Sequence, residues 1–166
     1  MPTEIERKFL VVDDRWRASA RSSEFLRQGY LPNAPGATVR VRRAGPFAFL
    51  TVKGEGIVAR PEFEYPIPIG DAEALLAGLC RPPLIEKTRH HVWHDGLVWH
   101  VDEFHSGNQG LVLAEVELQA VDQAVSLPLW VGREVTGDPA YRNSKLGWLP
   151  LENRSAAIRV EHAPKS

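Results

Sequence analysis

Near the start of the chain stands the alternating stretch Glu4-Ile5-Glu6-Arg7-Lys8-Phe9-Leu10. Successive side chains of a β-strand point to opposite faces. Glu4, Glu6 and Lys8 would therefore share one face, and Ile5 and Phe9 would lie on the other. For one strand alone, this pattern is typical of a solvated edge. It indicates a charged site only if other strands repeat it with charges that converge.

The same alternation recurs in seven further segments. Turn signals such as Gly45-Pro46 and Asp95-Gly96 separate neighbouring segments. The sequence predicts eight strands, over residues 4–10, 24–31, 38–43, 47–55, 58–67, 84–93, 97–104 and 111–119. Eight antiparallel strands joined mostly by hairpins predict a barrel or a sandwich, in a mainly β fold with flanking helices (α+β).

Helices are expected at the margins of this sheet. They are a short one after Asp13-Asp14, one over 71–80, an interrupted one over about 122–130 and a last one over about 138–146. The second is the clearest, because Asp71 can cap a run of good helix formers and Pro82-Pro83 ends it. Asp138-Pro139 is a favourable start for the last.

The composition is that of an ordinary globular protein. The 166 residues are 43% hydrophobic and 25% charged, so one domain is expected over 1–150, followed by a tail over 151–166. A net charge of −1 gives no argument for binding nucleic acid or an anionic membrane. The single cysteine, Cys80, excludes an intramolecular disulfide. With neither a long apolar run nor a signal peptide, the expected location is the cytoplasm.

One face of the predicted strands collects most of their charge. Its residues are Glu4, Glu6, Lys8, Arg40, Arg42, Lys53, Arg60, Glu62, Glu64, Lys87, Arg89, Asp102, Glu115 and Glu117. An ordinary small barrel would turn this face outward, and that explains each strand taken singly. However, the face contains few Ser, Asn or Gln residues, and acids and bases segregate by strand.

Acids two apart on one strand can share a divalent cation such as Mg²⁺ or Mn²⁺, and the bases can bind an anion. A barrel with the charges inside would need such ligands, because buried charges are unstable without compensation. A metal-bound polyphosphate would supply this compensation of charge. The residues alone support the inward and the outward arrangement about equally.

The ordered set of motifs resembles the CYTH superfamily, the triphosphate tunnel metalloenzymes. The stretch Glu4-Ile5-Glu6-Arg7-Lys8 is similar to the ExExK signature of that family. Further similar segments follow in the family's order: Arg40-Val41-Arg42, Thr51-Val52-Lys53, Glu62-Phe63-Glu64, Lys87-Thr88-Arg89, Val101-Asp102-Glu103 and Glu115-Val116-Glu117. The resemblance extends to about residue 150. It implies an eight-stranded antiparallel barrel with a charged tunnel and a C-terminal plug helix.

The resemblance also implies roles for individual residues. It implies phosphate contacts by Lys8, Arg40, Arg42, Lys53, Lys87 and Arg89, with Tyr141, Arg142 and Lys145 of the last helix near the terminal phosphate. It implies metal binding by Glu4 and Glu6, and a second metal or a positioned water at Glu62, Glu64, Asp102, Glu115 and Glu117. The candidate catalytic residues are Lys8, Tyr30, Lys53 and Lys87. A role for Tyr30 as a packed barrel residue fits equally well.

The short bacterial members of the family look most similar to this chain, and several of them hydrolyse inorganic triphosphate. The implied reaction is metal-dependent hydrolysis to diphosphate and phosphate, with a small-molecule substrate and neither nucleic acid nor membrane as partner. Three alternatives stay open: a class IV adenylyl cyclase, a thiamine or nucleoside triphosphatase, and a non-catalytic polyphosphate or nucleotide sensor. The intact set of acids favours catalysis, since anion binding alone would need only the bases. A homodimer also stays open.

Five of the six histidines lie within the predicted 84–104 hairpin or directly after it, namely His90, His91, His94, His100 and His105. Their alternation places them on both faces of the strands, which argues against a zinc site. His100 shares a face with Asp102 and is expected to reach the same lumen.

Overall fold

The computed structural model describes residues 1–33 and 35–148, and the predicted tail over 151–166 lies outside them. The strands in this part are β1 (Thr3–Val11), β2 (Ala20–Leu31), β3 (Thr38–Ala44), β4 (Phe47–Lys53), β5 (Ala59–Pro66), β6 (Ile85–His94), β7 (Leu97–Phe104), β8 (Val112–Glu117) and β9 (Val131–Glu134). The helices are α1 (Ile69–Gly78) and α2 (Asn143–Trp148), with 3₁₀ turns η1 (Arg15–Ser19), η2 (Ser106–Asn108) and η3 (Pro139–Tyr141). Among these helices, none has the length and apolar character needed to cross a membrane.

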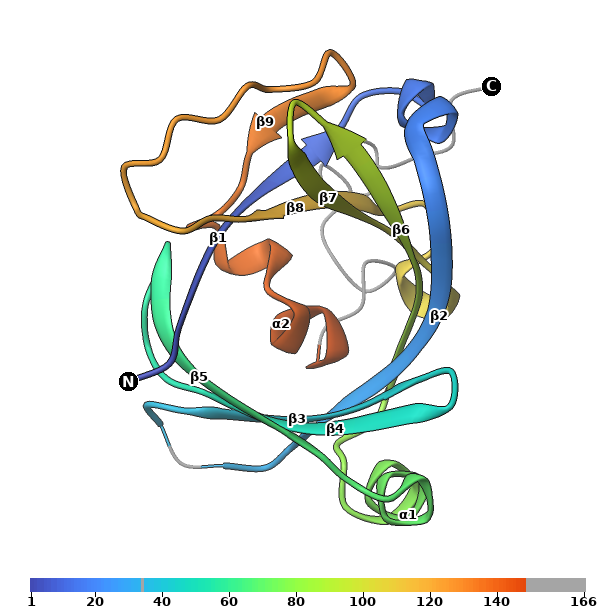
Figure 1. The fold of residues 1–166 in the computed structure, drawn as a ribbon. Coiled ribbons are helices and arrows are strands. Elements are labelled where there is room, and N and C mark those ends of the chain that lie inside the picture. Colours follow the sequence, from blue (N-terminus) through green and yellow to red (C-terminus); the bar gives the residue numbers. More distant parts are fainter. Residues whose placement is uncertain (34, 149–166) are drawn as a thin grey trace.

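The first eight strands close into an antiparallel barrel (Figure 1). Neighbouring strands follow the order β5-β4-β3-β2-β6-β7-β8-β1, and pairing of β1 with β5 closes the ring. The closing seam is short, with Thr3 opposite Pro61 and Ile5 opposite Ala59. This confirms the predicted eight-stranded antiparallel barrel.

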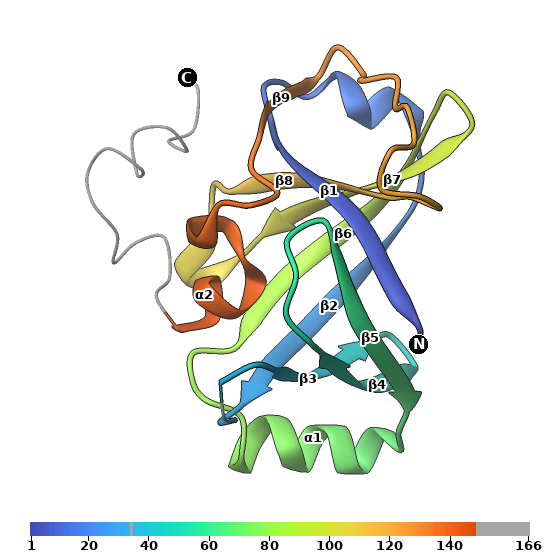
Figure 2. The ribbon, with the colours of Figure 1, turned by 90° about the vertical axis from the view of Figure 1, so that its left-hand side faces the viewer.

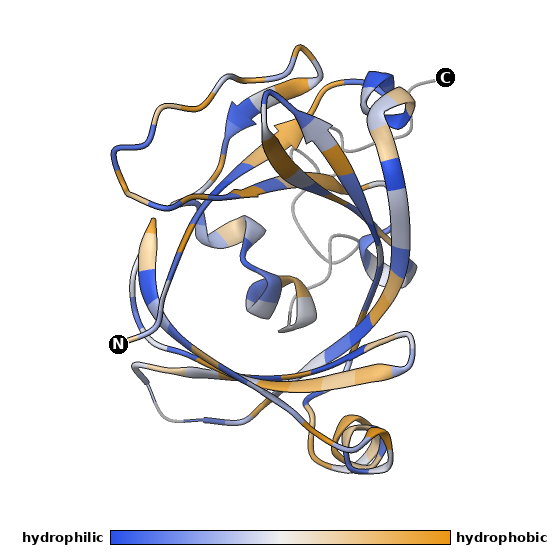
Figure 3. Ribbon diagram, in the orientation of Figure 1, coloured by the Kyte–Doolittle hydropathy of each residue, from blue (hydrophilic) through white to orange (hydrophobic). Residues whose placement is uncertain are grey.

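The charged face of the strands points into the barrel, and the apolar face is covered from outside. Lys87 and Asp102, on the inner face of the wall, are 1% and 0% exposed. On the outer face, Trp99 and Val101 are equally buried. Figure 3 shows hydrophilic and apolar residues alternating along the strands. Because the charged face lies inside the barrel, it is not an ordinary solvated face, which explains why it contains few Ser, Asn or Gln residues.

Two sets of elements cover the outer apolar face. Helix α1 lies across β3 and β4, where its Ala72 and Leu76 pack on Val41 and Ala48 (Figure 2). On the β7–β8 side, Trp16 of η1 packs in one cluster with Trp99, Val116 and Trp130. Burying an aliphatic or aromatic side chain contributes about 1.5–3 kcal/mol, so these covers stabilise the inverted arrangement.

One end of the barrel is filled with apolar side chains. Tyr141 and Leu146, from η3 and α2, pack there against Tyr30, Ile85 and Leu113. Figure 1, which looks along the barrel, shows α2 inside the ring of strands, and Figure 2 places it at one end. This is the position that the resemblance implies for a plug helix.

Two local predictions were wrong, and one strand was missed. The part of the chain over 122–130 forms no helix, and leads through a turn at Pro128 into β9. The strand β9 was not predicted, because four residues are too few to show an alternation; it pairs with β1, with Phe9 opposite Glu134. The last predicted helix is divided, since Asp138 caps η3 through the N–H of Ala140 at 2.9 Å and α2 starts only at Asn143.

An ion-pair cluster fastens η1 to the outer face of β6 and β7. Arg17 donates to both carboxylate oxygens of Glu103, at 3.1 and 2.6 Å, and His90 Nε2 lies 2.7 Å from the same carboxylate. The Arg17 hydrogen bonds hold the pKa of Glu103 below its usual value. A depressed carboxyl pKa stabilises the fold above the usual value, and this contribution is lost as the pH falls through the folded-state pKa.

We therefore expect Glu103→Gln to lower the free energy of unfolding by about 0.5 kcal/mol at neutral pH, a small effect because Arg17 is half exposed. The difference from wild type should vanish as the pH falls well below 4.5, the usual value for this carboxyl. Urea unfolding of both proteins at neutral and acidic pH would measure it. A difference that persists at acidic pH would contradict an electrostatic origin.

Candidate functional site

The lumen contains two cavities, of about 370 and 180 Å³. They share the lining residues Glu6, Arg40, Lys53, Arg60 and Asn143. The larger cavity opens toward the 36–38 and 54–57 loops and toward α2. The smaller one is enclosed by side chains of β1, β3, β4, β5, β6, β7 and β8, with Asn143 from α2.

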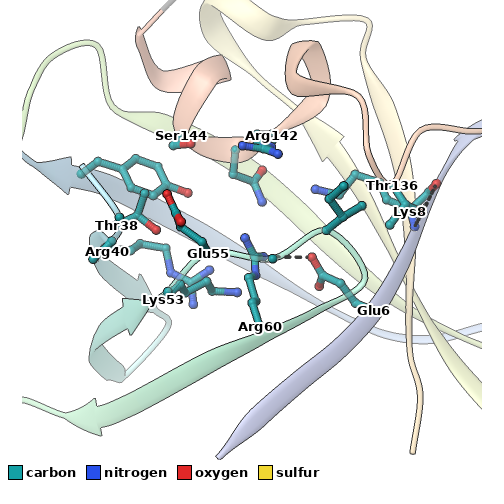
Figure 4. Close-up of a pocket in the computed structure, with 17 residues that line it drawn as sticks. Glu6, Lys8, Thr38, Arg40, Lys53, Glu55, Arg60, Thr136, Arg142 and Ser144 are labelled. Atoms are coloured by element: carbon teal, nitrogen blue, oxygen red, sulfur yellow. Dashed lines mark hydrogen bonds and ion pairs between the residues drawn. The ribbon is translucent and has the colours of Figure 1, made fainter. Parts of the chain in front are cut away.

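The larger cavity is rich in bases and hydroxyl groups (Figure 4). Its bases are Lys8, Arg40, Lys53, Arg60 and Arg142, against the acids Glu6 and Glu55. Its hydroxyl groups belong to Tyr30, Thr38, Thr136 and Ser144. Converging cations and hydroxyl donors in a partly enclosed space are suited to binding a multiply charged anion.

The smaller cavity contains most of the acids. They are Glu4, Glu6, Glu62, Glu64, Glu115 and Glu117, beside the bases Arg40, Arg42, Lys53, Arg60 and Arg89. These side chains come from β1, β3, β4, β5, β6 and β8. A set of carboxylate oxygens next to cations can bind a metal ion and hold it against an anion.

Register explains why acids and bases meet in the lumen. Glu4 lies opposite Arg60, and Lys8 lies opposite Glu115. Directly opposed side chains on neighbouring strands are close enough to interact. The resulting contacts are 2.9 Å from Arg60 Nε to Glu4 and 3.0 Å from Lys8 Nζ to Glu115.

The β3–β5 wall holds a second set of pairs. Lys53 lies 2.7 Å from both Glu4 and Glu62. Arg40 and Arg42 both contact Glu64, at 3.2 and 3.3 Å. The acids and bases thus compensate one another's charge in the described barrel.

Asp102 and Lys87 lie deeper in the wall. The Lys87 ammonium donates to Asp102 at 2.5 Å, and Arg89 donates to both Asp102 oxygens at 2.8 Å. Arg89 also contacts Glu115 at 3.0 Å. Neither Lys87 nor Asp102 is among the described residues that line the two cavities. Burial lowers the pKa of Lys87 to about 8, although the Asp102 charge opposes this.

Residues 2–143 match the model of the CYTH domain family. The chain belongs to the CYTH domain family. It is 44% identical to a protein of Acetivibrio thermocellus named inorganic triphosphatase, over 92% of this chain and 98% of that one. It is 38% identical to an inorganic triphosphatase of Nitrosomonas europaea, over 87% of this chain and 96% of that one. The crystal structure of an inorganic triphosphatase superposes with a TM-score of 0.64, at 36% identity, over 89% of this chain and 95% of that one.

The acids of this CYTH barrel carry the kind of oxygen donors that a hard divalent cation prefers. Burial first, and then the charge of Glu115, raise the pKa of Glu6. Burial, followed by Glu4, Glu62 and Glu6, raises the pKa of Glu117. Crowded carboxylates of this kind provide the oxygen ligands that Mg²⁺ and Mn²⁺ prefer, and a cation would relieve their repulsion.

Within residues 1–33 and 35–148, no three His, Cys, Asp or Glu side chains are grouped so that they could hold a metal ion as they stand. Lys53 and Arg60 bind the oxygens of Glu4, and Arg60 also binds Glu6. Metal binding at these acids would therefore require them to exchange partners.

Tyr30 reaches the larger cavity, as the catalytic prediction requires, and also packs in the apolar cluster at the plug end. Burial raises the pKa of its phenol, so the group stays protonated near neutral pH and can donate a hydrogen. Both predicted roles, as a packed residue and as a catalytic residue, are compatible with this position.

Lys145 is exposed and is not among the described residues that line the cavities, so the structure does not bring it to the site. Its helix contributes Asn143 and Ser144 instead, together with the preceding Arg142. The loop residues at 36–37 and 54–57 were also missed as lining of the larger cavity. Strand alternation identifies wall residues only, and no comparable period exists in loops.

His100 does line the smaller cavity, as its shared face with Asp102 predicts. Burial, and then the nearby Arg89, lower its pKa to about 4, so the imidazole is neutral near pH 7. His90 lies on the outer face with Glu103, so the histidines lie on both faces of the strands, as their alternation predicts.

Proposed function

We propose that this chain is a divalent-metal-dependent hydrolase that converts inorganic triphosphate and water into diphosphate and phosphate inside the barrel. The observation that carries the proposal is the charge distribution of the lumen, with a base-rich cavity joined to an acid-rich one. Two relatives that match almost their full length are named inorganic triphosphatases. The residues over 1–150 would form the catalytic domain.

An inorganic substrate is favoured by the lining of the larger cavity. Its aromatic member among the described lining residues is Tyr30, which already packs against the plug. A nucleobase or thiamine ring usually requires an aromatic or apolar surface. The abundance of cations instead matches an anion whose charge is spread over its whole length.

We assign phosphate binding to six of the seven Lys and Arg residues that line the two cavities in the described barrel. These are Lys8, Arg40, Arg42, Lys53 and Arg89, with Arg142 from the plug end. Lys87 lies behind them, so we assign it an electrostatic role. Asp102 is held by Lys87 and Arg89, and its position favours orienting these bases over binding metal.

We assign the metal to Glu4 and Glu6, with Glu62, Glu64, Glu115 and Glu117 as further oxygen ligands or as groups that position water. When bound, Mg²⁺ or Mn²⁺ would neutralise phosphate charge and lower the pKa of water. Phosphoryl transfer depends mainly on positioning and charge stabilisation, which the fixed lumen bases provide. Tyr30 can donate its proton to an oxygen of the leaving diphosphate.

The test is a substrate panel with each metal, in which products are identified by phosphorus NMR. We expect one phosphate and one diphosphate from each triphosphate with Mg²⁺ or Mn²⁺, and no turnover in excess chelator. The absence of phosphate release from triphosphate with both metals would refute the proposal. Diphosphate together with a cyclic nucleotide from ATP would indicate a cyclase, and tight binding without product would indicate a sensor.

A further inference from the structure

Arg60 stands at the closing seam of the barrel, where the two cavities meet. It lies opposite Glu4 in the β1–β5 register. Its side chain lines both cavities and is 25% exposed. It therefore has access both to the acid-rich and to the base-rich part of the lumen.

The Arg60 guanidinium spans two carboxylates of β1. Its Nε donates to Glu4 Oε2 at 2.9 Å, and its Nη2 donates to Glu6 Oε1 at 3.1 Å. Figure 4 shows the contact with Glu6 across the floor of the larger cavity. The planar guanidinium carries donors in a fixed fork, which suits it to holding two acceptors at once.

The two acids that Arg60 holds are those to which we assign the metal. A cation bound to these oxygens would lie within a few ångströms of the guanidinium, and like charges at that distance repel strongly in a partly enclosed site. The oxygens also have to exchange a hydrogen bond from Arg60 for a bond to the metal. Arg60 and the metal therefore compete for Glu4 and Glu6.

The larger cavity offers Arg60 a second environment. Arg60 lines this base-rich cavity together with Lys8 and Tyr30. A phosphate chain in the 370 Å³ cavity would present oxygens to the guanidinium. Lys53 differs, because it is also bound to Glu62 on the neighbouring strand.

We infer that Arg60 is an exchange residue: it holds Glu4 and Glu6 in the ligand-free barrel and releases them to the divalent metal as it turns toward the triphosphate. The inference rests on the proposed function. It makes Arg60 a positioning residue that couples metal binding to substrate binding, because each ligand removes the partner that blocks the other.

The test compares Mn²⁺ binding to wild type and Arg60→Gln without triphosphate, with free Mn²⁺ followed by electron paramagnetic resonance. We expect Arg60→Gln to bind Mn²⁺ about tenfold more tightly, or about 1.4 kcal/mol. The matched control is Arg142→Gln, which removes a base that lines the larger cavity and not the acid-rich one. Its Mn²⁺ affinity should change less than about twofold.

A second measurement follows triphosphate binding by calorimetry in chelator. Arg60→Gln should bind triphosphate several-fold more weakly than wild type, because a phosphate contact is lost. Arg60→Lys, which keeps the charge but cannot span both acids, should change Mn²⁺ affinity less than Arg60→Gln. Thermal unfolding of each variant checks that the barrel is still folded.

Unchanged or weaker Mn²⁺ binding by folded Arg60→Gln, or an equal gain in Arg142→Gln, would overturn the inference. So would unchanged triphosphate binding. The proposed function is judged separately, by phosphate release from wild type. Tighter Mn²⁺ binding by Arg60→Gln in a protein without triphosphatase activity would support the exchange and refute the hydrolase.

Discussion

Replacing Lys8 with alanine should lower kcat/KM for triphosphate hydrolysis at least about 100-fold, as expected for loss of one charge-stabilising group. The Lys8 ammonium is buried, reaches the larger cavity and lies 3.0 Å from Glu115. Burial opposes its charge, but Glu115 and Glu6 outweigh burial and raise the pKa of Lys8, so it is charged near neutral pH. In a poorly solvated lumen such a charge interacts strongly with phosphate.

The neighbouring Arg7 provides the matched control. It points outward from the same strand and donates to Glu134 of β9, at 2.9 and 2.7 Å. Arg7→Ala should change kcat/KM less than about twofold, because Arg7 adds no charge to the lumen. Its surface ion pair contributes only about 0–1 kcal/mol to stability. Steady-state kinetics on variants of confirmed thermal stability would measure both. Near-normal activity of Lys8→Ala, or equal losses in both variants, would contradict the lumen assignment.

The second large effect is expected for Glu6→Gln, which keeps the shape of the side chain and removes its charge. We expect a loss of at least about 100-fold in kcat, by analogy with removal of a single charge-stabilising group. Glu6 lines both cavities, and burial together with Glu115 raises its pKa. A carboxylate under this repulsion should interact favourably with a divalent cation.

Raising the Mn²⁺ concentration should recover part of the Glu6→Gln activity if the loss comes from weaker metal binding. Glu103→Gln is the control, because Glu103 lies on the outer face, bound to Arg17 and His90. It should retain kcat within about twofold. Full activity of Glu6→Gln at limiting Mn²⁺ would show that Glu6 does not bind the catalytic metal.

The alternation of side chains identified the charged residues that line the smaller cavity, because a strand has a fixed period of two. All six acids of the smaller cavity, and all its bases, were on the face predicted from Glu4, Glu6 and Lys8. Arg60 was placed on that face but received no role, since one strand pattern does not reveal what lies opposite. Asn143 and the loop residues at 36–37 lie outside the strands and had no such signal.

The sequence by itself determined which side chains share a face, since the pleat of each strand depends only on local backbone geometry. It did not determine which face is inside, because both faces carry buried side chains, such as Lys87 on one and Val101 on the other. The tertiary structure decides this, because α1, η1 and the segment leading to β9 cover the apolar face from outside. Only closure of the barrel brings Glu4 opposite Arg60 and so turns the opening stretch into one wall of the lumen.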